Sequence, residues 1–166
     1  MENRIKRSLK HKALLVLCGA LLIIIHISCD KQEVYYRFQE LKDAEWARHD
    51  TLFFDVDSAS FEINKRYNLT IEVSNNVNYP YRNIWIFMQS NINSDSVYTD
   101  MSKEFQLADE FGKWNGSGFG TIYQTSLSYG TITFKEKRDY RIKLEHGMRD
   151  EPLKGIEKVG IRISNN

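Results

Sequence analysis

The apolar and polar side chains change their pattern along the chain. From residue 51 onward, apolar residues recur at every second position, which is typical of strands that bury one face and leave the other in water. The clearest runs lie at residues 52–56, 67–73, 140–144 and 159–163. Further strands are expected at 97–107 and 129–135, and a short helix at 41–48.

One run differs from the others. Residues 84–88 read Ile-Trp-Ile-Phe-Met and are apolar at every position, which predicts a central strand covered on both faces. Turn signals separate the runs: Pro80 cannot donate a ladder hydrogen bond, and residues 91–96 are polar. About seven or eight short strands at this spacing predict one all-β domain, an antiparallel β-sandwich of jelly-roll-like type, over residues 49–166.

The first thirty residues have the pattern of an export signal. Residues 4–12 are basic and residues 13–25 are wholly apolar, as in the two regions of a secretory signal peptide. The apolar run would span about 20 Å as a helix, less than the ~30 Å of a hydrocarbon core. It ends at Ile27-Ser28-Cys29, which resembles a bacterial lipobox, although His26 departs from the usual leucine.

This pattern predicts that residues 1–28 are removed and that Cys29 becomes an acylated N-terminus. Acyl chains at ~0.8 kcal/mol per buried methylene would hold the protein on a membrane. Residues 29–48 would then form a lipidated spacer that lifts the domain off the membrane. Two alternatives remain open: an uncleaved membrane anchor, and ordinary cleavage that leaves Cys29 as a free thiol.

Charge and cysteine content narrow the class of protein. The first 28 residues hold five of the 23 bases and one of the 22 acids, so the remaining 138 residues carry a net charge of −3. This mild acidity argues against a nucleic-acid binder, which needs a cationic surface. Because no cysteine follows Cys29, we expect no disulfide in the mature domain.

A search for catalytic or metal-binding patterns finds none that is specific. His49 and His146 do not form a ligand-spaced pair, and the calcium-like start at residues 91–95 lacks the glycine and the closing glutamate. Asp55 and Asp57 share a strand face, but the sequence indicates no carboxylates opposite them. We therefore expect neither enzymatic activity nor a metal or cofactor.

The glycine-rich segment 112–120 is the most unusual local feature. It lacks the Gly-Lys-Ser/Thr ending of a phosphate loop and any helix to follow. Its glycines, interleaved with Trp114 and Phe119, predict a tight strand connection in which aromatic rings cover a neighbouring backbone. A partner-binding loop is the alternative.

Several motifs together resemble a known family, the gliding-motility lipoproteins called GldH. They are Ser28-Cys29-Asp30, Asn75-Asn76, Tyr79 to Asn83, Leu107-Ala108-Asp109, the Trp114 segment with its glycines, Met148-Arg149, and Gly155 to Arg162. The resemblance covers nearly all of the mature chain. It implies a lipid-anchored envelope component required for surface gliding, with no catalytic residues or cofactors. Members also occur where gliding is not evident.

Three classes of function follow from these observations. The leading one is a non-enzymatic lipoprotein, anchored by its lipid in the cell envelope and expected in the outer membrane, that contacts other envelope, motility or secretion-linked proteins. The second is a carbohydrate-binding β-sandwich, because 21 aromatic residues in the chain can supply stacking surfaces. Exposure of Trp46, Trp85 and Trp114 would separate these two. An esterase or glycosidase is the third class and lacks a recognisable site.

Two sets of residues are candidates for contacts or modification. Tyr79, Tyr81, Arg82 and Trp114 lie in expected loops and belong to residue types enriched at interaction hot spots. The alternative is that Pro80 only turns the chain and Trp114 only closes one end of the sandwich. Ser96, Ser58 and Thr51 lie in Asp-Ser/Thr-apolar tripeptides, which resemble sites where some relatives of gliding bacteria attach O-glycans.

Overall fold

The computed structural model describes residues 33–93 and 98–166, and it is built almost wholly of strands. The strands are β1 (Glu33–Glu40), β2 (Glu45–Trp46), β3 (Leu52–Val56), β4 (Arg66–Asn76), β5 (Asn83–Ser90), β6 (Thr99–Gln106), β7 (Ser117–Phe119), β8 (Ile122–Thr133), β9 (Tyr140–His146), β10 (Leu153–Lys154) and β11 (Ile156–Asn165). Two single 3-10 turns, η1 (Lys42–Ala44) and η2 (Ser58–Ser60), complete the described part. The all-β prediction is confirmed.

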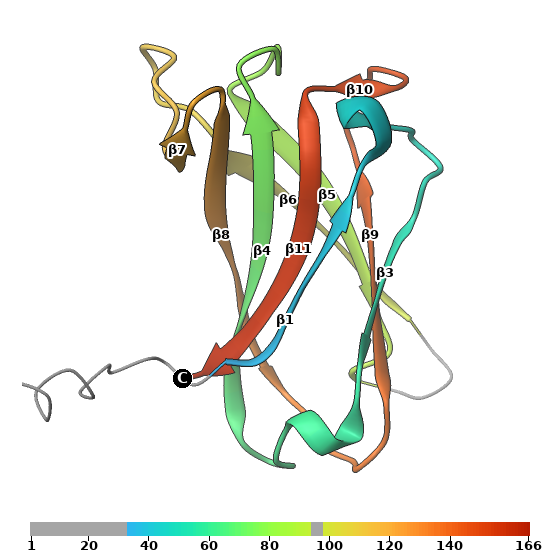
Figure 1. The fold of residues 1–166 in the computed structure, drawn as a ribbon. Helices are drawn as coiled ribbons and strands as arrows, with labels where there is room; N and C mark the ends of the chain where they lie inside the picture. Colours follow the sequence, from blue (N-terminus) through green and yellow to red (C-terminus); the bar gives the residue numbers. More distant parts are fainter. Residues whose placement is uncertain (1–32, 94–97) are drawn as a thin grey trace, which may run out of the picture. The chain divides into compact units, whose positions relative to one another are not determined.

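The strands form two main sheets that lie face to face (Figure 1). The five-stranded sheet has the order β1-β11-β4-β8-β7, the four-stranded sheet has the order β3-β9-β5-β6, and β10 pairs with β2. Every pairing is antiparallel. The long strands pair first with last and inward from there: β1 with β11, β3 with β9, β4 with β8, and β5 with β6. One antiparallel ribbon folded over itself in this way is a jelly roll, as predicted.

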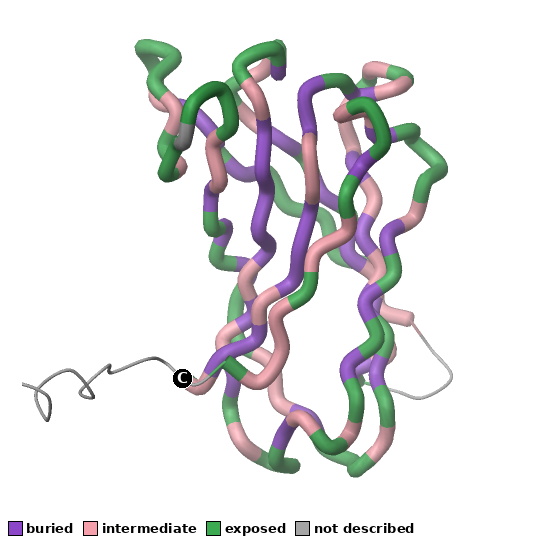
Figure 2. The backbone as a smooth tube through the Cα atoms, in the orientation of Figure 1, coloured by how far each residue is buried: buried purple, intermediate pink, exposed green. Residues whose placement is uncertain are grey.

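The core lies between the inner faces of the two sheets. Alternation places every second residue inward, and these residues are buried: Ile71 and Val73 in β4, Ile142 and Leu144 in β9, and Ile161 in β11. Buried positions concentrate along β4 and β11, and the connections at both ends are largely exposed (Figure 2). Apolar burial of this kind stabilises a fold by ~25 cal/mol per Å² of area removed from water.

The helix expected at 41–48 is wrong. The segment contains one 3-10 turn and then β2, and Asp43 and Ala44 adopt positive φ angles of 57° and 54°. Trp46 explains the difference, because its side chain is fully buried and its Nε1 donates to the carbonyl of Asp50 at 2.8 Å. Tertiary burial of one large ring outweighs a weak helical pattern.

The expected spacer is also wrong over its described residues, 33–48. Strand β1 pairs with β11 from Glu33 to Glu40, and the amide of Leu41 donates to the carbonyl of Glu157 at 2.9 Å. The sequence did not reveal β1, because its residues are partly covered on both faces and show no alternation in burial. The N-terminal segment is therefore a strand of the sandwich from Glu33 onward.

Strand β5 departs from its prediction in another way. It lies between β9 and β6, but only its inward residues are buried: Ile84, Ile86, Met88 and Ser90. Trp85 and Phe87, on the outer face, are 39% and 48% exposed. The expected second covering layer is absent from the described residues. The outer face of β5 is therefore apolar and exposed, although β5 is a central strand.

The two ends of the sandwich differ in their connections. We call the end formed by residues 41–51, 77–82, 107–121 and 147–155 the loop end; it lies at the top of Figure 1. The opposite end holds residues 57–65 and 134–139, the first residue of β1 and the last of β11.

Candidate functional site at the loop end

Tyr79 lies at the centre of the loop end, inside the molecule. Its side chain is only 3% exposed, and its hydroxyl donates to the carbonyl of Asn83 at 2.7 Å. Its ring contacts those of Tyr81 and Trp114, with centroids 5.8 and 6.4 Å apart. Burial, followed by the nearby Tyr81, raises the pKa of the Tyr79 phenol well above its ordinary value. Tyr79 therefore organises the loop end and does not offer a free surface.

Gly155 allows the chain to pass directly beneath Tyr79. It has a φ of +87°, and a Cβ at this position would lie 2.6 Å from the backbone of Tyr79. Its carbonyl accepts from the amide of Asn76 at 2.9 Å, and its amide donates to the carbonyl of Ala44 at 2.8 Å. Three connections distant in sequence therefore meet at one glycine.

Trp114 closes the loop end, as the structural alternative predicted. It is half-buried against the core, and its ring centroid lies 5.9 Å from that of Tyr123. A β-bridge joins it to Ala108. The glycine-rich segment continues into β7, which pairs with β8, so the predicted tight strand connection is confirmed. Gly120 turns the chain between these two strands with a φ of +64°.

Arg82 is exposed, but its contacts fix the neighbouring loop. Its Nη1 donates to the carbonyl of Glu110 at 3.1 Å and to that of Asp109 at 3.5 Å. The carbonyl of Arg82 accepts from the amides of Leu107 and Ala108 at 2.7 and 3.0 Å. Arg82 thus positions the turn that follows β6.

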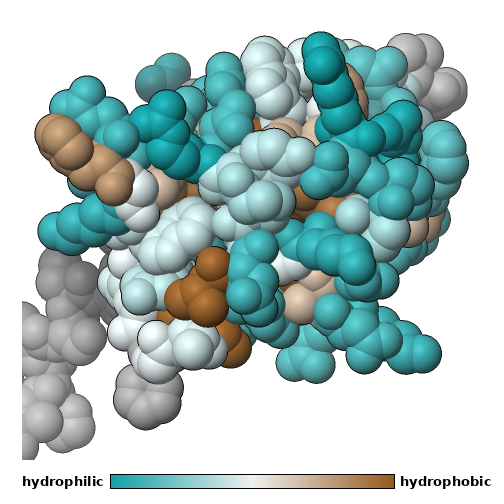
Figure 3. All heavy atoms as spheres, turned by 90° about the horizontal axis from the view of Figure 1, so that it is seen from above, coloured by the Kyte–Doolittle hydropathy of each residue, from teal (hydrophilic) through white to brown (hydrophobic). Residues whose placement is uncertain are grey.

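That turn presents an apolar side chain to solvent. Asp109 Oδ1 accepts from the amides of Phe111 and Lys113, both at 2.9 Å, which leaves Phe111 at the tip and 88% exposed. Val77 in the loop end and Ile122 at the start of β8 are also exposed, by 50% and 42%. Figure 3 looks onto this end and shows hydrophobic patches among hydrophilic atoms. Our sequence reasoning missed these residues; a phenylalanine inside a polar, glycine-containing turn was the available signal.

Tyr81 joins this cluster to residues 147–155. The carboxylate of Asp150 accepts a hydrogen bond from the Tyr81 phenol and raises its pKa. Of the four residues predicted to make contacts, Tyr79 is buried, Tyr81 and Trp114 are half-buried, and Arg82 is engaged by the 107–113 turn. The structure brings all four together, and Arg82 holds the turn that carries Phe111.

Of the predicted modification sites, two lie outside the described residues and two lie within them. Cys29 and Ser96 lie outside the described residues. The hydroxyl of Thr51 donates to Glu145, and the half-buried Ser58 donates its amide to Asp139 Oδ1 at 2.8 Å. Acylation and glycosylation at these positions remain predictions.

The carboxylates considered for catalysis have structural partners. Arg141 binds Asp55 through two nitrogens at 2.6 and 2.9 Å, and these hydrogen bonds lower the pKa of Asp55. Asp57 caps η2 by accepting from the amide of Ala59 at 2.6 Å. His146 is buried beside Trp46, with ring centroids 5.3 Å apart.

Residues 33–93 and 98–166 contain neither a cluster of metal ligands nor a membrane-spanning helix. No group of three or more His, Cys, Asp or Glu side chains in these ranges is arranged to hold a metal ion. Within the same ranges, no helix is long and apolar enough to cross a membrane.

Only one of the three tryptophans has the exposure that the carbohydrate alternative requires. Trp46 is fully buried and Trp114 is half-buried, so neither offers a stacking surface. Trp85 is exposed on the outer face of the four-stranded sheet.

Comparison with known proteins agrees with the fold and its motifs. The profile of the family described as "GldH lipoprotein" matches residues 33–163, from the start of β1 to nearly the end of β11. "Gliding motility lipoprotein GldH" of Flavobacterium johnsoniae is 30% identical over 164 residues, covering 93% of this chain and 96% of that protein. "Gliding motility lipoprotein GldH homolog" of Christiangramia forsetii is 29% identical over 152 residues, covering 87% and 91% of the two chains. The chain therefore belongs to the GldH lipoprotein family.

Proposed function

We propose that this protein is an outer-membrane lipoprotein, anchored through acylated Cys29, that contributes protein–protein contacts to a gliding-motility or secretion-linked assembly. It acts by binding and not by catalysis. Family membership and the printed names of its relatives support the link to motility. The observation that carries the contact role is the loop end, where a braced turn presents Phe111 at 88% exposure.

The position of β1 supports this arrangement. Only three residues, 30–32, separate Cys29 from β1, a length that spans at most about 14 Å when extended. A lipid on Cys29 would hold the end of the sandwich where β1 begins close to the membrane. Strand β4 has 11 residues and spans roughly 35 Å, so the loop end would face away from that membrane.

Crosslinked affinity purification from cell envelopes tests the contact surface. We expect Phe111→Ser to reduce recovery of crosslinked partners by about tenfold, a loss usual for a central apolar contact. Ile63→Ser is the matched control, because Ile63 is 45% exposed and lies at the opposite end. Equal recovery of the same partners with wild type, Phe111→Ser and Ile63→Ser would contradict the proposed surface.

Metabolic labelling with a clickable fatty acid tests the anchor separately. The wild-type protein should take up the label, and Cys29→Ala should not. A Cys29→Ala protein that still carries the label would exclude the proposed acylation site, whatever the result for Phe111.

A further inference from the structure

The outer faces of the two main sheets differ in how their side chains are satisfied. On the five-stranded sheet, Glu72 is only 1% exposed, and its carboxylate accepts from Arg162 Nε and Ser126 Oγ, both at 2.8 Å. Gln124 Nε2 adds a longer contact at 3.4 Å. Around Glu72, this face is thus covered by polar side chains that bind one another, and the aromatic residues Tyr36 and Phe38 of β1 are half-buried.

The four-stranded sheet instead presents aromatic rings on its outer face. Trp85 and Phe87 alternate with buried residues of β5, so both side chains point outward, and they are 39% and 48% exposed. Two residues along one strand are separated by about 6.6 Å. The spacing of these two positions is close to the width of one sugar ring.

The ring of Phe87 packs directly against Gly147. Its amide donates to the carbonyl of Trp85 at 2.7 Å, which places it directly across from that residue. A Cβ at this position would lie 2.7 Å from the ring of Phe87 and 3.1 Å from Cβ of Trp85. Any side chain at residue 147 would therefore displace the ring of Phe87 from its position on this face.

Three cavities meet at Phe87 and together form an open groove across the strands. One of about 430 Å³ is lined by Trp85, Gly147 and Met148, and a second of about 390 Å³ extends from Gly147 toward Arg48. The third, of about 360 Å³, extends along Gln89 and Ser102 of β5 and β6. Each volume falls within the range of small-molecule sites.

The polar groups around the groove carry mixed charge and can both donate and accept. They are Asn83, Gln89, Asp100, Lys143, Glu145 and Arg149. Asp100 and Glu145 balance Lys143 and Arg149, so this set of residues does not create the positive potential that a polyanion needs. The planar amides, carboxylates and guanidinium instead suit the hydroxyl groups of a neutral ligand.

A peptide strand fits this surface less well. Extended peptides bind sheets by adding to an unpaired edge, where main-chain hydrogen bonds are available. Strand β5 is paired on both sides, with β9 and with β6, so its backbone has no free ladder positions. A ligand on this face must therefore bind through ring stacking and side-chain hydrogen bonds.

We propose that the outer face of the four-stranded sheet binds a neutral polysaccharide chain, with sugar rings stacked on Trp85 and Phe87. A sugar has an apolar face for the rings and a hydroxyl edge for the polar rim. The open groove accommodates the interior of a chain. This site is separate from the loop end and does not depend on the function proposed for it.

Titration calorimetry with the purified full chain tests the proposal. The probes are hexasaccharides of β-linked glucose, of N-acetylglucosamine and of mannose. We expect heat of binding with at least one of them, and a change in tryptophan emission on binding because Trp85 is exposed. Absence of binding to all three probes overturns the proposal.

Three variants locate the binding. Trp85→Ala should weaken it at least tenfold, and Gly147→Ala should weaken it without removing either ring, because the added methyl group displaces the ring of Phe87. Phe53→Ala is the matched control, since Phe53 is 47% exposed on the same outer face but outside the three cavities. Thermal unfolding of each variant verifies that it is folded.

Two further outcomes separate this site from the loop end. Phe111→Ser should bind the sugar as wild type does, even where it loses crosslinked partners. If sugar affinity is unchanged in both Trp85→Ala and Gly147→Ala, the proposal is overturned. It is also overturned if the protein binds no sugar but crosslinks to a protein partner in a way that depends on Trp85.

Discussion

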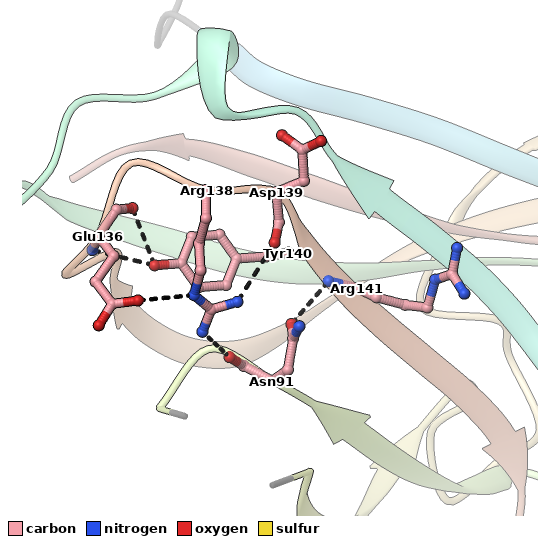
Figure 4. A network of polar contacts seen from close by, with 6 residues as sticks. All are labelled: Asn91, Glu136, Arg138, Asp139, Tyr140 and Arg141. Atoms are coloured by element: carbon pink, nitrogen blue, oxygen red, sulfur yellow. Dashed lines mark hydrogen bonds and ion pairs between the residues drawn. The ribbon is translucent and has the colours of Figure 1, made fainter. Parts of the chain in front are cut away.

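The two ends of the sandwich are built for different tasks, although each joins the same two sheets. At the opposite end, the guanidinium of Arg138 makes three contacts: with Glu136 Oε2 at 2.9 Å, with the carbonyl of Asn91 at 2.6 Å and with that of Asp139 at 3.4 Å (Figure 4). The same guanidinium lies 4.0 Å from the ring centroid of Tyr140. These contacts fix the short connection at residues 134–139 and join it to Asn91, which follows β5.

The loop end uses its hydrogen bonds to brace longer connections. Arg82 binds carbonyls of the 107–113 turn, and Asp109 shapes the tip from within. Its most exposed apolar side chain is Phe111, at 88%, whereas Ile63 at the opposite end is 45% exposed. The polar contacts named here thus fix a connection at the opposite end, whereas at the loop end they hold a turn that exposes an apolar side chain.

The largest expected effect lies beneath the opposite end. Phe134 is fully buried and stacks on Phe61 at 4.0 Å and against Tyr140 at 4.9 Å. Phe134→Ala should lower the free energy of unfolding by about 3–5 kcal/mol, because it removes buried area and leaves a cavity. Urea denaturation measures the change. A loss below 1 kcal/mol would show that this end does not depend on its aromatic cluster.

A somewhat smaller effect is expected where the loop end is most tightly packed. Gly155→Ala combines a positive φ with a Cβ 2.6 Å from the backbone of Tyr79, and should cost about 2–4 kcal/mol. Gly112→Ala is the control, because its φ is also positive, at +82°, but nothing lies within 4 Å of its Cβ position. If both variants lost the same free energy of unfolding, the positive φ alone would explain the effect, and the contact with Tyr79 would contribute nothing.

Arg82→Ala should have a smaller effect on stability and a local effect on the 107–113 turn. Loss of its hydrogen bonds to the carbonyls of Asp109 and Glu110 is expected to cost about 1 kcal/mol. Amide hydrogen exchange should quicken at Phe111 and Lys113 in particular. Arg66→Ala, an exposed arginine at the start of β4, should change neither stability nor exchange there. Unchanged exchange in Arg82→Ala would contradict the bracing role.

The smallest effect concerns pH and His146. Burial lowers the pKa of His146, so the unfolded chain binds a proton at a pH where the folded chain does not. Stability should therefore be intact above pH ~6.5 and fall as the pH drops below it. Thermal unfolding between neutral and mildly acidic pH should show a shallower fall for His146→Leu than for wild type. Parallel curves would exclude His146 as the titrating group.

The repeating pattern of the sequence was sufficient for most of the fold. Alternation at 52–56, 67–73, 140–144 and 159–163 is a local property, because a strand with one buried face needs an apolar residue at every second position. The structure has strands at all four places, and β3 begins and ends where it was expected. The jelly-roll class followed from the number and spacing of such runs.

Strand β1 and the arrangement of the candidate sites could not be predicted from the sequence, because they depend on tertiary contacts. Tyr36 and Phe38 lie on the outer face of β1 and are half-buried there, with Phe38 over Gly160, so no alternation marks this strand. Hydrophobicity alone does not distinguish Trp46, which is fully buried, from Trp85, which is exposed.

The sequence by itself thus determined the export signal pattern, the strand-forming runs and the family motifs, because each is written in neighbouring residues. Which side chains those strands cover, and which they leave exposed, was decided by pairing between distant segments. Tyr79, Gly155 and Ala44 meet only because β4, β11 and β1 are neighbours in one sheet. Phe87 is exposed because no layer of the described chain covers β5. Burial is a property of the assembled sheets, and no residue carries it alone.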